Sequence, residues 1–196
     1  MKIVRPEPKQ KMSADAKKVF KGVIYDVYQW QQKQYDGSYK TFETIKRPDT
    51  VVIFPRIATG KFLTIREIQP GFTKPWFSLP VGRVEKQGDL VAEAKRELLE
   101  ETGYKCDNFT FWYSHQPEAK IDWFVHCFIA KDCYKFEEIV KDKGEKVIEL
   151  NEMSFDEIVE LYVNNERLRG GLTVEKFLRA RLDPMEMKAI KHLFLD

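Results

Sequence analysis

The sequence lacks the features that mark several large protein classes. It has only three cysteines among 196 residues and no C-x-x-C pair, which suits reduced thiols rather than a disulfide framework. Its three histidines have no mutual zinc spacing, and 33 basic against 31 acidic residues argue against binding nucleic acid by bulk charge. No apolar run approaches the ~20 residues that span a bilayer, and the charged N-terminus has no signal-peptide core. We therefore expect a soluble, cytoplasmic protein that binds neither nucleic acid nor a membrane.

What the chain does contain is an ordinary globular balance, with 43% hydrophobic and 33% charged residues. β-Branched and aromatic residues predict a hairpin from strands over 19–30 and 39–47, turned at Asp36-Gly37. Further strands are expected over 51–55, 61–67, 76–79, 109–114 and 123–130, and helices over 90–102, 155–164, 173–181 and 184–195. This order predicts an α+β domain with a mixed sheet. We divide the chain into an N-terminal extension with the hairpin, residues 1–48, and one domain with C-terminal helices, residues 49–196.

The helix expected over 90–102, between Asp89 as N-cap and Gly103 after its C-terminus, carries an unusual concentration of acid on one flank. At about 100° per residue, four glutamates share an arc beside the apolar one: Glu93, Glu97, Glu100 and Glu101. Like charges four residues apart repel by roughly 0.2–0.5 kcal/mol a pair, and the helix dipole disfavours acids near the C-terminus. A cation would relieve both penalties, and oxygen ligands select Mg²⁺ or Mn²⁺. The alternative is a solvated acidic face paired with Lys95 and Arg96.

Residues 82–104, GRVEKQGDLVAEAKRELLEETGY, follow a specific pattern around this helix. They resemble the Nudix box, G-x5-E-x7-R-E-U-x-E-E-x-G-U with U a bulky apolar residue, and Leu79-Pro80-Val81-Gly82 is similar to the family's L-P-x-G entry. Eight residues fall on the fixed positions in register: Gly82, Arg96, Glu97, Leu98, Glu100, Glu101, Gly103 and Tyr104. The resemblance implies a Nudix fold, an α/β/α sandwich around a mixed central sheet. It also implies a hydrolase of nucleoside diphosphates linked to another group.

One position of the box departs from the family pattern. Gly88 stands where the first Glu is expected, and in the family that Glu braces the box arginine, which is Arg96 here. Two explanations stay open, because Asp89 could reach Arg96 instead or the loop could be one residue out of phase. A Nudix domain that binds a nucleotide or a partner without hydrolysis is therefore an alternative, although the intact Glu97, Glu100 and Glu101 argue against it. A structural protein with an acidic helix is a more distant one.

The resemblance implies a role for each box residue. The ligands of one or more Mg²⁺ (or Mn²⁺) ions would be Glu97, Glu100, Glu101 and the carbonyl of Gly82. Arg96 would orient the carboxylates, and a water made more acidic by the metal would attack one phosphorus and release a nucleoside monophosphate. The general base would be a box glutamate or an acid on the later loop 142–149, where Glu145 is our candidate. The alternative for Glu145 is an ordinary charged loop.

A second segment points to the substrate. FETIKR, residues 42–47, resembles the aromatic-Glu-x-x-x-Arg strand of ADP-ribose and ADP-sugar pyrophosphatases, where the aromatic stacks on adenine, the Glu accepts from the exocyclic amine and the Arg contacts the ligand. The residues that would do so here are Phe42, Glu43 and Arg47. The alternative is a plain amphipathic strand with Phe42 in the core. Against a simple assignment, Ser78 replaces the Glu before L-P-x-G, and Gln69 replaces an Arg, which leaves the nearby Arg66 as a candidate ligand contact.

The same subfamily exchanges N-terminal strands between subunits, which implies a homodimer. Tyr25, Tyr28 and Trp30 would then offer a second stacking face across the dimer, or they are core or interface residues. Other nucleotide substrates stay open: a different nucleotide sugar, a dinucleoside polyphosphate, a dinucleotide cofactor or an oxidised nucleoside triphosphate. The sequence therefore predicts the chemistry more closely than the substrate.

Overall fold

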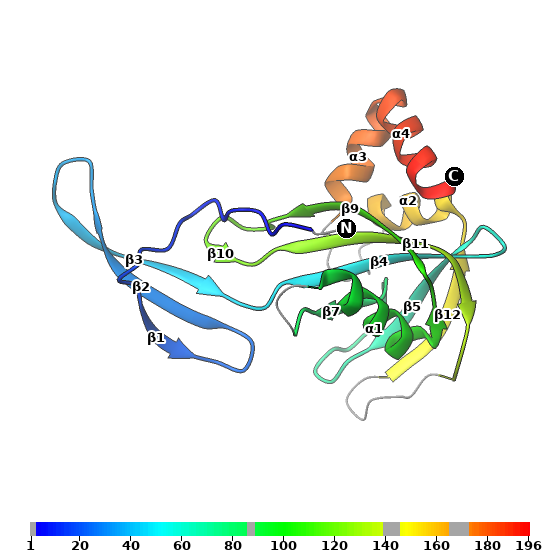
Figure 1. Ribbon diagram of the computed structural model, residues 1–196, viewed down its shortest axis with the longest axis horizontal. Helices are drawn as coiled ribbons and strands as arrows, with labels where there is room; N and C mark the ends of the chain where they lie inside the picture. The colour runs from blue at the N-terminus through cyan, green and yellow to red at the C-terminus, as the bar shows by residue number, and fades with distance from the viewer. Residues whose placement is uncertain (1–2, 86–88, 139–145, 165–172) are drawn as a thin grey trace.

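A mixed sheet of eight strands forms the body of the protein in a computed structural model that describes residues 3–85, 89–138, 146–164 and 173–196. The sheet runs β12-β5-β4-β11-β8, with β6 paired to β5, β7 to β4 and β9 to β11. These strands are β4 (Thr50–Ile57), β5 (Phe62–Ile68), β6 (Trp76–Ser78), β7 (Val81–Arg83), β8 (Tyr104–Lys105), β9 (Asn108–His115), β11 (Val125–Lys135) and β12 (Lys146–Met153). The helices are α1 (Leu90–Thr102) on one face, and α2 (Phe155–Asn164), α3 (Val174–Leu182) and α4 (Pro184–Leu195) on the other (Figure 1). The expected α+β sandwich is confirmed.

The two central strands, β4 and β11, are buried on both faces because helices cover each side of the sheet. Successive side chains of β4 alternate between two cores. Phe54 packs with Phe194 among the aromatic residues under α2, α3 and α4, whereas Ile53 packs with Leu98 under α1. Burying a side chain of this size contributes roughly 1.5–3 kcal/mol. Helix α1 is thus fixed to the centre of the sheet by its apolar arc, which leaves its acidic flank to one side.

Helix α1 begins and ends where the sequence predicts. The Asp89 carboxylate accepts a hydrogen bond of 2.9 Å from the backbone N–H of Ala92. Gly103 ends the helix with a φ of 70°, a conformation that glycine adopts without strain. The other three predicted helices also match the structure to within one residue at each end. In the described part of the chain, no helix is long and apolar enough to cross a membrane.

Two strand predictions were wrong in detail. The strand expected over 19–30 is two antiparallel strands, β1 (Lys17–Lys21) and β2 (Asp26–Lys33), separated by a turn in which Gly22 N–H donates to Tyr25 O at 2.9 Å. The charged segment expected to be a loop over 142–149 becomes strand β12 at Lys146 and pairs antiparallel with β5. Strand pairing explains both differences. β1 pairs with β2 across the turn, and β12 pairs with β5, which lies far away along the chain.

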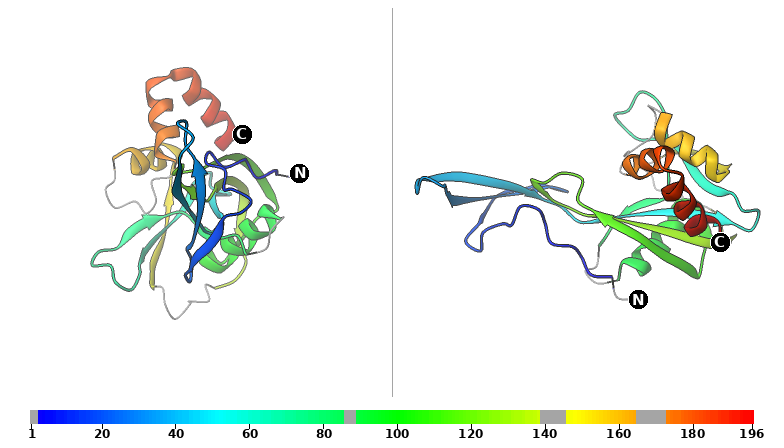
Figure 2. Two further views of the ribbon diagram at one scale, coloured as in Figure 1. Left: turned by 90° about the vertical axis from the view of Figure 1, so that its left-hand side faces the viewer. Right: turned by 90° about the horizontal axis from the view of Figure 1, so that it is seen from above.

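The predicted N-terminal hairpin is confirmed and belongs to a projecting arm. Strands β2 and β3 (Tyr39–Lys46) pair from Asp26↔Lys46 to Lys33↔Tyr39. The arm sheet has the order β1-β2-β3-β10 and extends away from the body (Figures 1 and 2). Its fourth strand, β10 (Ile121–Asp122), lies between β9 and β11 in the sequence and pairs in parallel with the end of β3. The arm is therefore joined to the body at its base, through β10 and the chain that enters β4.

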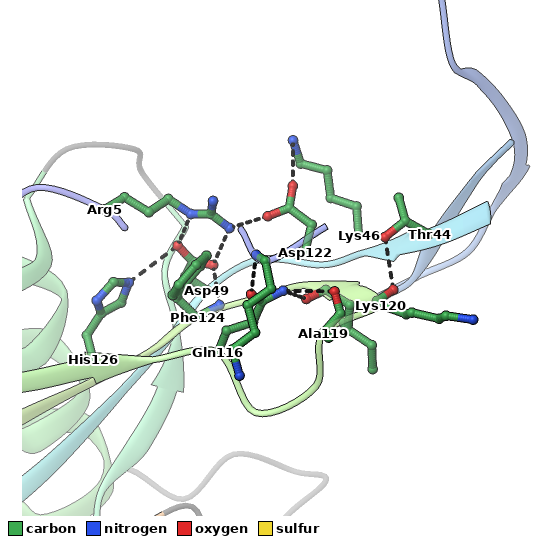
Figure 3. Close-up of polar contacts among 12 residues, drawn as sticks. Arg5, Thr44, Lys46, Asp49, Gln116, Ala119, Lys120, Asp122, Phe124 and His126 are labelled. Atoms are coloured by element: carbon green, nitrogen blue, oxygen red, sulfur yellow. Dashed lines mark hydrogen bonds and ion pairs between the residues drawn. The ribbon is translucent and has the colours of Figure 1, made fainter. Parts of the chain in front are cut away.

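A polar network ties the N-terminal segment to this base (Figure 3). Arg5 donates to Asp49 and Asp122 at 2.6 Å each, and its guanidinium lies 4.5 Å from the centroid of the Phe124 ring. Asp49 also accepts from the Phe124 backbone N–H at 2.8 Å and contacts His126 Nε2 at 3.3 Å. Asp49 lies just before β4, so this network fixes residues at the start of that central strand.

The network makes the stability of the fold depend on acid pH. Burial alone would raise the pKa of Asp49, but hydrogen bonds from His126, Arg5 and the Phe124 backbone outweigh it and hold the pKa at about 2. Because an unfolded aspartate titrates near ~3.9, the carboxylate stabilises the fold by about 2–3 kcal/mol above pH ~4, and this contribution is lost as pH falls towards 2. We expect urea unfolding of Asp49→Asn to show a weaker loss of stability between pH 5 and 2 than the wild type. The exposed Asp107→Asn is the control, and an unchanged pH slope in Asp49→Asn contradicts the assignment.

Candidate active site

The acidic flank of α1 faces β7, the short strand that carries Gly82. β7 pairs with β4 at Val51↔Gly82, and α1 packs on the same sheet through the fully buried Ala94 and Leu98. A Cβ built on Gly82 would lie 1.7 Å from Glu97 Cδ and 2.0 and 2.2 Å from the two carboxylate oxygens. Gly82 has no positive φ, so the requirement for glycine here is one of space. Backbone and carboxylate are therefore in direct contact at the first box residue.

Arg96 connects three of the four glutamates on this flank. Its Nε and Nη2 donate to Glu93 Oε2 at 3.3 and 3.0 Å, its Nη1 donates to Glu100 Oε2 at 2.6 Å, and its Nη2 contacts Glu97 Oε1. Nη2 also lies 3.5 Å from the carbonyl oxygen of Arg83 on β7. The Arg96 guanidinium thus lies between the helix and the strand and bonds to three carboxylates of the helix.

The sequence left open which carboxylate braces Arg96, and in the structure Glu93 accepts two of its hydrogen bonds. Asp89, which the sequence offered as a substitute partner, instead caps the N-terminus of α1 by accepting from the Ala92 N–H. Gly88 lies outside the described residues. Glu93 was identified only as a member of the acidic arc. Its spacing of three residues from Arg96 was the signal that could have singled it out, since residues i and i+3 are neighbours on a helix.

The carboxylates differ in their exposure to solvent. The side chain of Glu97 is 11% exposed and that of Glu100 is 57% exposed. Glu101 Oε2 accepts a hydrogen bond of 2.9 Å from the backbone N–H of Val81, which ties the end of α1 to β7. The flank is therefore closed at Glu97 and open at Glu100, where a ligand can approach from solvent.

The local charges shift two pKa values. Burial raises the pKa of Glu97, against the lowering effect of Arg96, because the ionised form loses its hydration. Partial burial opposes ionisation of Arg96, but its hydrogen bond to Glu93 and the charges of Glu97 and Glu100 raise the pKa of the guanidinium. Positive charge is favoured at this place, and a second cation would stabilise the ionised form of Glu97.

The donor set suits a hard divalent cation. It offers carboxylate oxygens on one helix flank beside a glycine backbone, and oxygen ligands are what Mg²⁺ and Mn²⁺ prefer. Across residues 3–85, 89–138, 146–164 and 173–196, no three such side chains already converge as a closed metal cage. Glu97 and Glu100 turn oxygens towards Arg96 instead. A cation at these oxygens therefore has to compete with the guanidinium.

The residues expected to bind the nucleotide lie on the arm. Phe42 is 36% exposed, so it is not the core residue that the alternative required, and its ring is 6.1 Å from that of Trp30. Glu43 accepts from Gln29 Nε2 at 3.0 Å. The Arg47 guanidinium lies 4.4 Å from the Trp123 ring centroid and 5.4 Å from that of Tyr25. Within one chain, β3 extends along the projecting arm, whereas α1 lies against the sheet of the body (Figure 1).

Two further positions named by the sequence, Arg66 and Ser78, lie in different surroundings. Arg66 on β5 forms an exposed ion pair of 3.1 Å with Glu149 on β12. Ser78 is buried, and its hydroxyl donates to Glu67 at 3.0 Å, beside the Trp76 indole N–H at 2.9 Å from the same oxygen. A buried carboxylate therefore does lie beside position 78, supplied by β5. Glu145, the candidate general base, lies outside the described residues.

Comparisons with known proteins identify the family and support the fold. The NUDIX domain family model matches residues 46–171 of the chain. The ADP-ribose pyrophosphatase of Bacillus subtilis (strain 168) is 26% identical over 151 residues, which are 76% of this chain and 80% of that protein. The methanol dehydrogenase activator of Bacillus methanolicus is 26% identical over 140 residues, 71% of this chain and 75% of that protein. A solved structure of an ADP compounds hydrolase matches with a TM-score of 0.66 at 16% identity, over 92% of this chain and 98% of the other, and supports the fold.

The family match and the similarity to a pyrophosphatase indicate a pyrophosphohydrolase. Because the family model spans well over half of the 196 residues, the chain belongs to the Nudix family. Nudix hydrolases act on nucleotide small molecules and generally use a divalent metal ion. Within the family, this sequence is similar to an ADP-ribose pyrophosphatase.

Proposed function

We propose that the protein hydrolyses the pyrophosphate bond of ADP-ribose or an ADP-sugar, with Mg²⁺ (or Mn²⁺) as cofactor. The observation that carries the proposal is the contact between Gly82 and the Glu97 carboxylate on the acidic flank of α1. The substrate assignment is supported by the similarity to ADP-ribose pyrophosphatase and by the aromatic, acidic and basic residues of β3 and its end. The metal ligands in this proposal are Glu97, Glu100, Glu101 and the carbonyl of Gly82.

Arg96 and three glutamates of the flank have tasks in this proposed reaction. A bound divalent cation supplies positive charge that neutralises the pyrophosphate and makes the attacking water more acidic. Arg96 orients Glu97 and Glu100, while the Val81 N–H holds Glu101. The water oxygen forms a bond to one phosphorus as the anhydride P–O bond breaks, and the leaving phosphate keeps the electron pair of that bond. The proton of the water passes to a carboxylate, either a box glutamate or Glu145.

The nucleotide end of the substrate is assigned to the arm. Phe42 would stack on adenine, Glu43 would accept from its amino group, and Arg47 would contact the ligand. Arg66 is the candidate for a phosphate contact, and it would exchange its pairing with Glu149 for the ligand. Base stacking on an aromatic side chain contributes about 1–3 kcal/mol, which is enough to set a preference between nucleotides.

A homodimer would bring these residues to a metal site. The arm projects away from α1 of its own chain (Figures 1 and 2), so we propose that it reaches the site of a second copy. β1 is an edge strand, and the arm exposes a run of large apolar residues: Val19, Phe20, Val23, Ile24 and Tyr25. Unpaired edges and apolar patches favour association with another chain. Residues 1–48 would then be the dimerisation element and residues 49–196 the hydrolase domain.

Mixing two inactive variants tests whether the site is shared. Phe42→Ala lacks the stacking ring and Glu97→Gln lacks a metal ligand, so each has low kcat/KM alone. In a symmetric dimer whose arms cross, a mixed dimer has one intact site, and statistical exchange restores about a quarter of wild-type kcat/KM. Mass measurement by light scattering must show the dimer in every sample. A dimer that forms without recovery of activity contradicts the crossing of the arms.

We place this activity in the cytoplasm. The three cysteines, Cys106, Cys127 and Cys133, are buried and form no disulfide. Reduced thiols suit a reducing compartment. Fractionation of cells with an antibody against the protein checks this placement.

A panel of nucleotides tests the substrate. Wild-type protein with Mg²⁺ is assayed for nucleoside monophosphate release from ADP-ribose, an ADP-sugar, another nucleotide sugar, a dinucleoside polyphosphate, a dinucleotide cofactor and an oxidised nucleoside triphosphate. We expect the highest kcat/KM for ADP-ribose or the ADP-sugar. A higher kcat/KM for another member of the panel changes the substrate assignment, and the proposed hydrolase activity still stands. No turnover of any member contradicts hydrolysis and favours the alternative of a binding domain.

A further inference from the structure

Glu93 is a nearly buried carboxylate that the proposed metal set does not include. It sits on α1 three residues before Arg96, and its side chain is 8% exposed. Arg96 approaches Glu93 Oε2 with two nitrogens, Nε at 3.3 Å and Nη2 at 3.0 Å. This one oxygen therefore accepts from both N–H groups on the Nε edge of the guanidinium, in a charge-assisted contact.

The other contacts of Arg96 go to oxygens that the metal would need. Nη1 donates to Glu100 at 2.6 Å, and Nη2 contacts Glu97. If a cation takes these oxygens, the guanidinium loses two of its acceptors. A partly buried charge that loses its partners is costly, so the arginine would compete with the metal unless another acceptor holds it.

Building on the proposed function, we propose that Glu93 is the positioning residue that holds Arg96 while Glu97 and Glu100 bind the divalent cation. Its contact uses the Nε edge of the guanidinium, whereas the Glu100 contact uses the opposite nitrogen, Nη1. The Glu93 contact can therefore persist when the Glu100 contact is released. Glu93 acts through Arg96 and touches neither the substrate nor the metal.

The local structure explains why this role falls to Glu93 in this chain. Gly88, which stands at the first acidic position of the box, has no side chain to offer. Asp89 is already the acceptor for the Ala92 N–H at the start of α1. The carbonyl of Arg83, 3.5 Å from Nη2, adds a weak contact from β7. A carboxylate on the helix itself, one turn before Arg96, meets the need.

Three variants separate positioning from a merely structural role. Glu93→Gln keeps the shape and removes the charge, and Glu93→Asp keeps the charge and shortens the reach. The matched control is Glu175→Gln, which removes an exposed intrahelical contact with Arg179 of 2.7 Å on α3, away from α1. Mn²⁺ affinity is measured by electron paramagnetic resonance without substrate, and Tm, kcat, KM and the Mg²⁺ dependence of kcat follow.

We expect Glu93→Gln to bind Mn²⁺ about 10- to 100-fold more weakly than the wild type, as substitution of a partner behind a metal ligand generally does. The Mn²⁺ affinity of Glu93→Asp should lie between those of Glu93→Gln and the wild type, and that of Glu175→Gln should match the wild type. The kcat of Glu93→Gln falls more than its KM rises, and added Mg²⁺ recovers part of it. If Glu93→Gln does not fold, Glu93→Asp alone decides.

Unchanged Mn²⁺ affinity with a lowered Tm overturns the inference, because Glu93 would then only stabilise the helix. Wild-type protein that binds no Mn²⁺ overturns it as well. Wild-type protein that binds Mn²⁺ but hydrolyses no nucleotide refutes the proposed function, and the Mn²⁺ affinities of the variants still decide the role of Glu93.

Discussion

Replacing Glu97 by Gln will lower kcat for ADP-ribose by about 100- to 1,000-fold, because several kcal/mol of charge stabilisation depend on the metal ligands, at tenfold per ~1.4 kcal/mol. Glu97 is the most enclosed candidate ligand, in contact with Gly82 and Arg96. The neutral amide fills the same space and removes the charge that attracts the cation. Steady-state kinetics at saturating ADP-ribose and Mg²⁺ measure the effect.

The control for this variant is another helical glutamate. Glu186→Gln changes an exposed residue in the first turn of α4, and it should leave kcat within about twofold of the wild type, since an exposed carboxylate there contributes only through the helix dipole. Circular dichroism and Tm must show that Glu97→Gln is folded. A folded Glu97→Gln enzyme with wild-type kcat removes this carboxylate from the reaction.

Gly82→Ala will also lower kcat/KM by about 100-fold, although it adds only a methyl group. The new Cβ would overlap Glu97 Cδ, at 1.7 Å, so the carboxylate or β7 has to move. A shift of this kind typically costs about 1–3 kcal/mol in a packed site, which should appear as a lower Tm. Steady-state kinetics of Gly82→Ala measure the loss of kcat/KM, and thermal unfolding measures the change in Tm.

A double-mutant cycle shows whether the methyl group acts through Glu97. In a Glu97→Ala background the shorter side chain leaves room for the added methyl group, so Gly82→Ala should cost little further activity or stability. Additive losses in the double variant would show that Gly82 acts by another route, such as its own carbonyl.

The α1 helix could be predicted closely because its determinants are local. Asp89, the apolar arc and Gly103 lie within or next to the helix, and the structure places its ends as expected. The contact between Gly82 and Glu97 follows from the pairing of β7 with β4, a long-range contact that no local pattern encodes. The family resemblance implied only that both residues bind the same metal, and hydrophobic periodicity could not bring them together.

Other features escaped prediction for identifiable physical reasons. β12 reads as a charged segment, but an edge strand tolerates charge on its solvent side, and only pairing with β5 defines it. The partner of Arg96 was sought at Gly88 and Asp89, because the box pattern suggested those positions, and the helix geometry supplies Glu93. The dimer remains a proposal, because contacts between chains are not encoded by a local sequence pattern.

The formation of AMP from ADP-ribose tests the central claim most directly. Wild-type protein is assayed with Mg²⁺, then with excess EDTA, and again after Mg²⁺ is restored. The proposed metal-dependent hydrolysis at the acidic flank of α1 predicts rapid AMP release, its loss in EDTA and its recovery with Mg²⁺. AMP release that continues unchanged in EDTA, or no AMP at any Mg²⁺ concentration, would contradict it.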